Sequence, residues 1–240
     1  MTMSAPDFRR RLPSKVSAIV FDVDGTLYDQ RRLRLMMFRR LLSECLKDPL
    51  LGFQSIRFLR AYREAHESLR DESAPLDLGS RQLEIACRST AVQHRQAGEI
   101  VNRLFETAPL VHLHRFVRAG VVEFLQTARA RGVRLGVYSD YPAEAKLQAM
   151  SLTGCFDVVV SSHDAAVGLL KPHPAGLQCC LARLDVKAEN ALFVGDRIDI
   201  DAECARRANV CPIIVGSQKC SDSCMTASGF GNLNALLFEP

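Results

Sequence analysis

Short apolar runs alternate with helical patterns over the second half of the chain. The runs have the length of buried strands and lie at 133–138, 158–160, 191–194 and 211–215. Between them, apolar residues recur every three or four positions, as in amphipathic helices, at 120–130, 143–152, 175–184 and 201–208. This alternation is typical of a parallel sheet covered by helices on both faces. One further apolar run, 18–21, predicts another strand near the start of the chain.

A long segment without strand patterns separates that first strand from the others. Its apolar spacing predicts helices at about 33–46, 54–69 and 81–105, with a loop at 71–80 and a stop near Pro109. An insertion into an α/β domain explains this layout most economically. We therefore expect an α/β core formed by residues 1–28 and 112–240, with an all-helical insertion at 29–111.

The net charge of +4 on 240 residues is too small to argue for nucleic acid, and an anionic small substrate fits it equally well. No stretch approaches the roughly 20 apolar residues that span a bilayer. We expect no nucleic-acid partner, no membrane insertion and a cytoplasmic location. The nine cysteines are an odd number and do not predict a disulfide framework. Cys220 and Cys224 could hold a metal, but no second pair at zinc-site spacing accompanies them.

Arginines are frequent on the polar side of the second predicted helix, at Arg57, Arg60, Arg63 and Arg70. A charged helix face is usually only solvated. The alternative is that one of these side chains reaches an anionic substrate, because a planar guanidinium suits carboxylate and phosphate groups.

The strongest chemical signal is a pair of carboxylates at the end of the first strand, Asp22 and Asp24. Residues two apart on a strand point to the same face, so these acids should project together. Two acids in one small site repel unless a divalent cation lies between them or one of them keeps its proton. Gly25 permits a sharp exit from the strand. The plainer alternative is a solvated turn, because Asp is common in turns.

Three further polar clusters follow predicted strands or precede helices. Ser139 and Asp140 offer a hydroxyl and backbone amides for an anion, although a Ser there also caps helices. Lys171 stands beside prolines that exclude regular structure and could neutralise a phosphate or an aspartate; otherwise it is a surface lysine. A group of aspartates follows the strand at 191–194, namely Asp196, Asp199 and Asp201. Helix capping explains one of them but hardly all three, and such hard oxygen ligands suit Mg²⁺.

Taken together, these segments resemble the haloacid dehalogenase superfamily, over about 16–28 and 112–217. Asp22 to Thr26 match its first motif, Asp-x-Asp-Gly-Thr. The resemblance implies a Rossmann-like three-layer core with a helical cap, as in phosphoglycolate phosphatase-like members. It implies that Asp22 is the nucleophile, Asp24 the acid and base, Ser139 a phosphoryl ligand and Lys171 a neutralising cation. The implied Mg²⁺ ligands are Asp22, the backbone carbonyl of Asp24, and Asp196, with Asp201 in support.

One residue departs from the family pattern, because Asp140 stands where many relatives have Asn. A second negative charge beside a phosphate is unfavourable unless the side chain turns away, caps a helix or pairs with an arginine. Direct contact between residue 140 and the substrate is therefore in doubt.

The resemblance predicts a Mg²⁺-dependent phosphatase acting on a small phosphorylated metabolite through an aspartyl-phosphate intermediate. Halide displacement is disfavoured, because dehalogenases of the superfamily lack an acid at the position of Asp24. A sugar-phosphate phosphomutase shares all these residues and is the enzymatic alternative. A non-catalytic binding or regulatory protein of the same fold is the alternative from another class.

Overall fold

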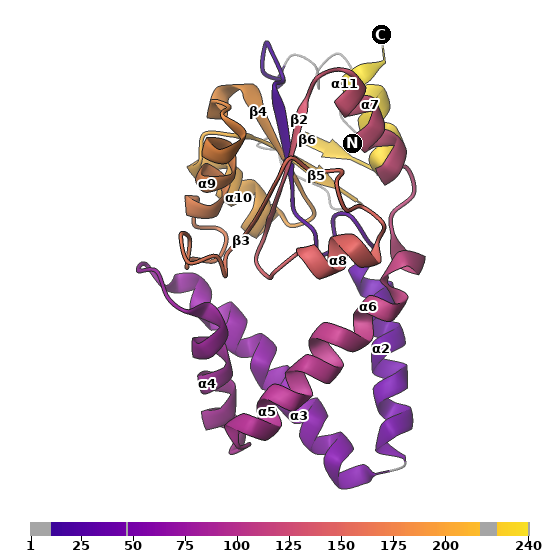
Figure 1. Ribbon diagram of the computed structural model, residues 1–240, viewed down its shortest axis with the longest axis vertical. Coiled ribbons are helices and arrows are strands. Elements are labelled where there is room, and N and C mark those ends of the chain that lie inside the picture. Colours follow the sequence, from indigo (N-terminus) through magenta and orange to yellow (C-terminus); the bar gives the residue numbers. More distant parts are fainter. Residues whose placement is uncertain (1–10, 47, 217–224, 240) are drawn as a thin grey trace.

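The computed structural model describes residues 11–46, 48–216 and 225–239. It contains a six-stranded sheet formed by β1 (Ala18–Phe21), β2 (Arg134–Ser139), β3 (Val158–Ser161), β4 (Ala191–Gly195), β5 (Cys211–Val215) and β6 (Met225–Ala227). All the strands are parallel, in the order β3-β2-β1-β4-β5-β6 (Figure 1). After β1, the chain adds β2 and β3 on one side of it and then β4, β5 and β6 on the other. The direction of strand addition therefore reverses beside β1. Ligands of open α/β sheets bind at such a reversal, outside the carboxyl ends of the strands.

Helices cover both faces of the sheet, which confirms the three-layer α/β core. On one face lie α7 (Val121–Ala130), α8 (Glu144–Ala149) and α11 (Phe230–Phe238); on the other lie α9 (Ala175–Leu184) and α10 (Glu203–Arg207) (Figure 1). Successive side chains of β1 alternate between the two cores. Ile19 and Phe21 pack under α7 and α11, whereas Val20 packs under α9. A strand buried on both sides is therefore apolar at every position.

Between β1 and α7 the described residues form helices joined by loops, with one isolated bridge between Tyr28 and Val117. The helices are α2 (Gln30–Cys45), α3 (Pro49–Ser68), α4 (Leu78–Thr90), α5 (His94–Ile100) and α6 (Ala108–Leu113). Short helical turns lie at Leu69–Asp71, Val101–Thr107 and His114–Phe116. This group lies beyond the carboxyl end of the sheet (Figure 1) and has an apolar core of its own, which includes Phe58, Tyr62, Ala86 and Ile100. The division of the chain into two domains stays a prediction.

The prediction of a single helix over 81–105 is wrong. α4 begins at Leu78, capped by the Asp77 side chain, and ends at Thr90, because Ala91 adopts a left-handed φ of 58°. The chain restarts as α5 and continues through Val101–Thr107 into α6. Pro109 does not stop it, because it occupies the first turn of α6, where its missing N–H is not needed. The sequence interpretation also missed β6 and α11, which follow the strand expected to be the last.

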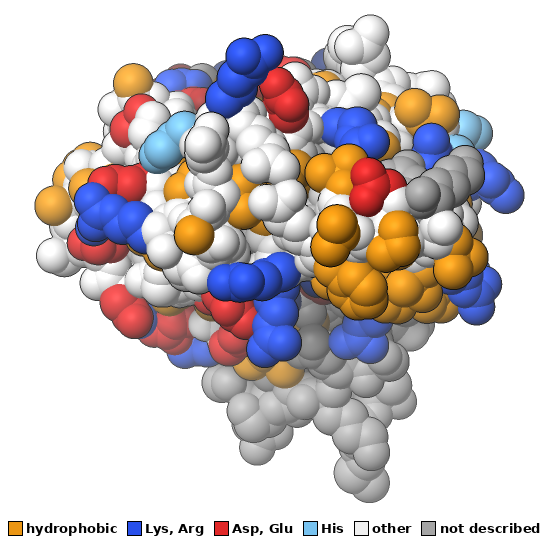
Figure 2. Space-filling model, turned by 90° about the horizontal axis from the view of Figure 1, so that it is seen from below, with side chains coloured by type: hydrophobic (Ala, Val, Ile, Leu, Met, Phe, Trp, Pro, Cys, Tyr) orange, Lys and Arg blue, Asp and Glu red, His pale blue; other side chains and the backbone are white. Residues whose placement is uncertain are grey.

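Only part of the apolar face of α2 is buried inside the molecule. Leu33 is buried, and Met37 and Leu41 are partly buried against the cores. Seen from the helical end of the molecule, hydrophobic side chains gather on the side of α2 and the start of α3 (Figure 2). The exposed ones are Leu35, Phe38, Leu42, Leu46, Leu50, Leu51 and Phe53. The wide apolar face expected from sequence is therefore split between the core and the surface.

The remaining general expectations have mixed outcomes. In the described part of the chain, no helix is long and apolar enough to cross a membrane. Seven cysteines of that part are free thiols. Cys180 is buried in α9, where its side chain packs in the core. Cys220 and Cys224 lie outside the described residues, so the metal reading of that pair is not tested.

Candidate active site

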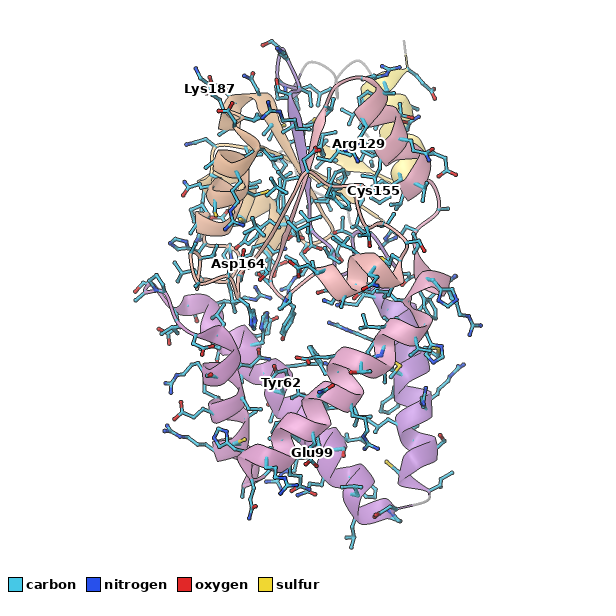
Figure 3. The ribbon with its side chains drawn as sticks, viewed as in Figure 1. Tyr62, Glu99, Arg129, Cys155, Asp164 and Lys187 are labelled. Atoms are coloured by element: carbon cyan, nitrogen blue, oxygen red, sulfur yellow. The ribbon has the colours of Figure 1, made fainter. Side chains whose placement is uncertain are left out.

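A cavity of about 610 Å³ lies between the carboxyl ends of the strands and the helical group. Figure 3 shows side chains from both parts of the molecule in this region. Five of the six residues that the family resemblance assigns to catalysis or metal binding line the cavity wall, namely Asp22, Asp24, Lys171, Asp196 and Asp201. The aspartates follow β1 and β4, and Lys171 lies in the loop between β3 and α9. Asp140, Arg63 and Arg70, also singled out from the sequence, line the same cavity.

Asp22 is held in a defined position directly after β1. Its backbone N–H donates to the carbonyl of Val194 at 2.9 Å, and the Thr26 hydroxyl donates to its Oδ2 at 2.9 Å. Lys171 Nζ donates to Asp22 Oδ1 at 2.5 Å and to Asp201 Oδ1 at 2.8 Å. Burial and the neighbouring carboxylates hold the pKa of Asp22 well above its usual value, although Lys171 opposes this. One ammonium thus bridges two buried acids without neutralising the whole cluster.

Asp196 and Asp201 complete that cluster after β4. Asp201 Oδ2 accepts from the backbone N–H groups of Asp196 at 3.1 Å and Arg197 at 3.0 Å. Burial, followed by the charge of Asp201, raises the pKa of Asp196 to about 6. Carboxylate oxygens of Asp22, Asp196 and Asp201 lie within 4.8 Å of one another. Burial and neighbouring carboxylates thus raise the pKa values of Asp22 and Asp196. Such a cluster of hard oxygen donors fits Mg²⁺, which would relieve the repulsion between them.

Two glycines make this close approach of acids possible. A Cβ on Gly25, whose φ is +105°, would lie 2.7 Å from Asp196 Cγ. A Cβ on Gly195 would lie 2.5 Å from Asp201 Cγ. Both distances are far inside van der Waals contact, so any larger residue would displace a carboxylate. The turn after β1 is also fixed by Arg118, which donates to the Gly25 carbonyl from Nε at 3.0 Å and Nη2 at 2.7 Å.

Asp24 lines the same cavity but has a different set of partners. Lys146 Nζ, on α8, donates to its two carboxylate oxygens at 2.7 and 2.5 Å, and the Tyr28 hydroxyl also donates to it. Burial opposes ionisation of Asp24, yet Lys146 and these hydrogen bonds lower its pKa below the usual value. The two aspartates of the motif therefore differ in electrostatic state: the pKa of Asp22 is raised and that of Asp24 is lowered.

Ser139 ends β2 in a fully buried position and is absent from the cavity wall. Its hydroxyl has no hydrogen-bond partner among the described residues, which is costly for a buried polar atom. Its neighbour Asp140 does line the cavity. Asp140 pairs with Arg70 from the helical group, which is one of the three arrangements expected for it from sequence. Asp199 lies outside the cavity wall and pairs with Arg197.

Sequence reasoning missed several residues that hold the site together. Lys146 was counted only as part of a helix, and Tyr28 only as the end of the first segment. A usable signal existed for Tyr28, because it follows Asp24 by four residues as Thr26 follows Asp22, and both hydroxyls donate to the earlier carboxylate. No local signal existed for Lys146, because the pairing of Lys146 with Asp24 spans 122 residues.

The comparisons with known proteins agree with this architecture. A pyrophosphatase PpaX of Bacillus cereus (strain Q1) is 29% identical over 185 residues, which cover 76% of this chain and 75% of the relative. A HAD phosphatase from Thermococcus onnurineus has a TM-score of 0.65 at 21% identity, covering 93% of this chain and 99% of the other.

A β-phosphoglucomutase from Clostridium difficile has a TM-score of 0.62 at 16% identity, covering 93% of this chain and 94% of the other. The two solved structures show the likeness of the fold. The family model of haloacid dehalogenase-like hydrolases matches residues 16–209, which span β1, the helical group and the acid cluster after β4. The chain therefore belongs to the haloacid dehalogenase-like hydrolase family.

Proposed function

We propose that this protein is a Mg²⁺-dependent phosphatase that hydrolyses a small phosphate monoester through a phosphorylated Asp22. The observation that carries the proposal is the bridge from Lys171 to Asp22 and Asp201, next to Asp196, at the core side of the cavity. A buried nucleophile beside fixed positive charge and oxygen ligands suits phosphoryl transfer, which depends on positioning and charge neutralisation. The name of the relative PpaX, a pyrophosphatase, is in keeping with phosphoryl chemistry.

The reaction has two steps that use the two aspartates in turn. A carboxylate oxygen of Asp22 attacks phosphorus and forms an acyl phosphate, while the bond from phosphorus to the ester oxygen breaks. Asp24, which is ionised and paired with Lys146 in the free protein, must take up a proton before it donates one to the departing oxygen. Water then attacks phosphorus, Asp24 accepts its proton, and inorganic phosphate leaves with the Asp22 carboxylate restored. The Lys146 and Tyr28 contacts hold the Asp24 carboxylate in place in the free protein.

Charge on the transferring group is balanced by residues around Asp22. Lys171 lies within hydrogen-bond distance of the nucleophile and can follow the phosphoryl oxygens. The unpaired hydroxyl of Ser139 is a donor that a phosphoryl oxygen would satisfy. Asp22, Asp196 and the backbone carbonyl of Asp24 would hold Mg²⁺, with Asp201 in support. When bound, Mg²⁺ supplies positive charge to the phosphoryl oxygens and lowers the cost of an ionised Asp22.

We propose that residues 29–111, which form most of the helical group, act as a cap over this site and that the core comprises residues 1–28 and 112–240. The support is that the cavity wall combines residues of both parts. A cap excludes water and selects the substrate. The phosphomutase alternative uses the same aspartates, and a requirement for a phosphorylated donor would distinguish it.

The proposal is tested by hydrolysis of 4-nitrophenyl phosphate with Mg²⁺, comparing wild type with Asp22→Asn. Loss of the nucleophile should abolish turnover while the far-UV circular dichroism and thermal unfolding remain those of a folded protein. Asp199→Asn is the matched control, because this exposed acid lies near Asp196 and Asp201 in sequence but outside the cavity wall. Turnover by Asp22→Asn at a rate near that of wild type would overturn the nucleophile assignment.

A further inference from the structure

The cavity wall holds six lysine or arginine side chains, and they fall into two groups. Four of them form ion pairs with carboxylates: Lys171 with Asp22 and Asp201, Lys146 with Asp24, Arg70 with Glu67 and Asp140, and Arg197 with Glu67 and Asp199. The other two, Arg34 of α2 and Arg63 of α3, form no ion pair with any residue that the structure describes. Both unpaired cations belong to the helical group.

Other exposed arginines of these helices, such as Arg39 and Arg57, also form no ion pair among the described residues, but Arg34 and Arg63 differ from them in lining the cavity. Arg60, Arg88 and Arg95 each pair with a glutamate one turn away. The glutamate one turn after Arg63 is Glu67, and Arg70 holds it with two hydrogen bonds, from Nε at 2.8 Å and Nη2 at 3.1 Å. Glu106 also lines the cavity but pairs with neither arginine. The charge on this part of the wall is therefore left unbalanced.

The Arg63 guanidinium lies 6.0 Å from the centre of the Phe105 ring, a cation–π distance. Burial, followed by the charge of Arg34, lowers the pKa of Arg63. An anion bound beside both side chains would offset the repulsion between their charges.

The wall around these arginines is apolar. Leu33 and Met37 come from α2, Leu104 from the helical turn Val101–Thr107, and Leu110 and Leu113 from α6. Arg34 and Arg63 are themselves exposed, so an anion can reach both of them from the open side of the cavity. Arginine is also the residue whose planar, forked donors match the oxygens of carboxylate and phosphate.

We infer that Arg34 and Arg63 bind a second oxyanion of the substrate, so that the substrate is a phosphate monoester that also carries a phosphate or a carboxylate group. The phosphoryl group to be transferred lies at Asp22 on the core side, and the second anion lies across the same cavity at the helical side. This inference rests on the proposed phosphatase function for the transferred group. The position of the second anion rests only on the two unpaired arginines.

The test uses alkyl phosphates of three to six carbons whose far end carries a carboxylate, a phosphonate or a neutral carboxamide. For wild type, kcat/KM for the best anionic compound should exceed that for its carboxamide by about tenfold or more, the effect of one charge-assisted contact. Arg34→Gln and Arg63→Gln should each bring this ratio towards one, and Lys at either position should restore part of it. The preferred end group distinguishes a carboxylate substrate from a bisphosphate.

Two further arginines of the same helices, exposed like Arg34 and Arg63 but outside the cavity wall, serve as matched controls. Arg39→Gln on α2 and Arg60→Gln on α3 remove the same charge outside the cavity and should keep the wild-type ratio. A wild-type ratio near one at every chain length would overturn the inference. An equal fall of the ratio in the control variants would also overturn it, because the effect would then come from general charge.

A binding measurement separates this inference from the proposed function. Titration calorimetry compares alkyl diphosphonates, which cannot be hydrolysed, with alkyl monophosphonates of the same length. Tighter binding of the diphosphonate that is lost in Arg63→Gln supports the second anion site, even if no phosphate ester is turned over. Equal binding of the two compounds by wild type would overturn it, even if 4-nitrophenyl phosphate is hydrolysed.

Discussion

Arg70 donates from Nη1 to Asp140 Oδ2 at 2.8 Å, and the same nitrogen donates to the backbone carbonyl of Lys171 at 2.6 Å. One side chain at the end of α3 thus contacts two loops at the carboxyl edge of the sheet. Asp140 also accepts from the backbone N–H of Lys171 at 3.1 Å. Burial opposes ionisation of Asp140, but Lys171, His66 and Arg70 hold its pKa well below the usual value. The charge at residue 140 therefore ties the helical group to the core and fixes the loop of Lys171.

Asp140→Asn should lower the free energy of unfolding at pH 7 by about 1–3 kcal/mol, because it removes one charge of a nearly buried ion pair and leaves Arg70 uncompensated. The sign of the pH dependence follows from the lowered pKa. Ionised Asp140 contributes stability above its unfolded pKa of about 3.9, and this contribution is lost as pH falls through the lower folded value. Urea unfolding of both proteins at pH 7 and in acid measures the contribution of Asp140 to the free energy of unfolding.

The difference between wild type and Asp140→Asn should therefore shrink as the pH is lowered below about 4. Asp199→Asn is the control, because its carboxylate is 68% exposed and its pair with Arg197 should add little. An Asp140→Asn protein as stable as wild type at pH 7 would show that the pair with Arg70 does not hold the two parts together.

Asp22→Asn should make the protein more stable when Mg²⁺ is removed with EDTA. The raised pKa of Asp22 means that its ionised form is penalised in the fold by burial and by the neighbouring acids. For an acid with a raised folded pKa, stability falls as pH rises from the unfolded pKa to the folded pKa, so wild type carries a penalty at neutral pH that the variant lacks. The variant lacks that charge, and its thermal midpoint in EDTA should be the higher of the two.

Added Mg²⁺ should reverse this order, because a cation that binds the folded state stabilises it by mass action and Asp22 is a proposed ligand. Thermal unfolding with EDTA and then over a Mg²⁺ series gives both comparisons. A Mg²⁺ response of equal size in wild type and Asp22→Asn would count against Asp22 as a ligand. Hydrolysis of 4-nitrophenyl phosphate by wild type should disappear with EDTA and return with Mg²⁺.

Lys146→Met should move the pH optimum of hydrolysis to higher pH. Without the ammonium of Lys146, burial is the largest influence left on Asp24, and burial raises the pKa of a carboxyl group. An acid with a higher pKa stays protonated, and able to donate, to higher pH. The pH profiles of kcat/KM for wild type and Lys146→Met on 4-nitrophenyl phosphate measure the shift.

Lys146→Arg is the matched control, because it keeps a positive charge beside Asp24 and should keep the profile near that of wild type. A Lys146→Met profile that falls in height without moving along the pH axis would show that Lys146 acts on something other than the proton affinity of Asp24.

The core of the fold could be predicted from the sequence because its strands are buried on both faces. A strand such as β1 is apolar at every position, and the acid pair that follows it marks the carboxyl edge of the sheet. The helical group was less predictable. Its α4 ends at a left-handed Ala91, a conformation that nothing in the local composition indicates. β6 is three residues long and too short to show a pattern.

The residues of the candidate site likewise divide into those that the sequence could predict and those that it could not. Asp22, Asp24 and Asp196 closely follow strands and Lys171 stands beside prolines, so local sequence was enough to single them out. Lys146 and Arg63 reach the cavity from amphipathic helices, where a charged residue looks the same whether it faces water or a ligand. Only packing between distant segments decides which side of such a helix lines the cavity.

Gly195→Ala should weaken both the fold and the metal site, because the added methyl group would lie 2.5 Å from Asp201 Cγ. Asp201 would have to leave the backbone N–H groups of Asp196 and Arg197 and the ammonium of Lys171. Overpacking of this kind costs about 1–3 kcal/mol in free energy of unfolding. Urea unfolding measures that loss, and the Mg²⁺ concentration that gives half of the thermal stabilisation should rise.

Gly98→Ala should have the opposite effect on stability, and it serves as the control for Gly195→Ala. Gly98 lies inside α5, and a Cβ there meets no atom within 4 Å. Alanine restricts the unfolded chain and favours the helix, so this variant should gain about 0.5–1 kcal/mol and keep its Mg²⁺ response. If Gly195→Ala behaved like Gly98→Ala, the close approach of Asp201 to β4 would not be what requires glycine at residue 195.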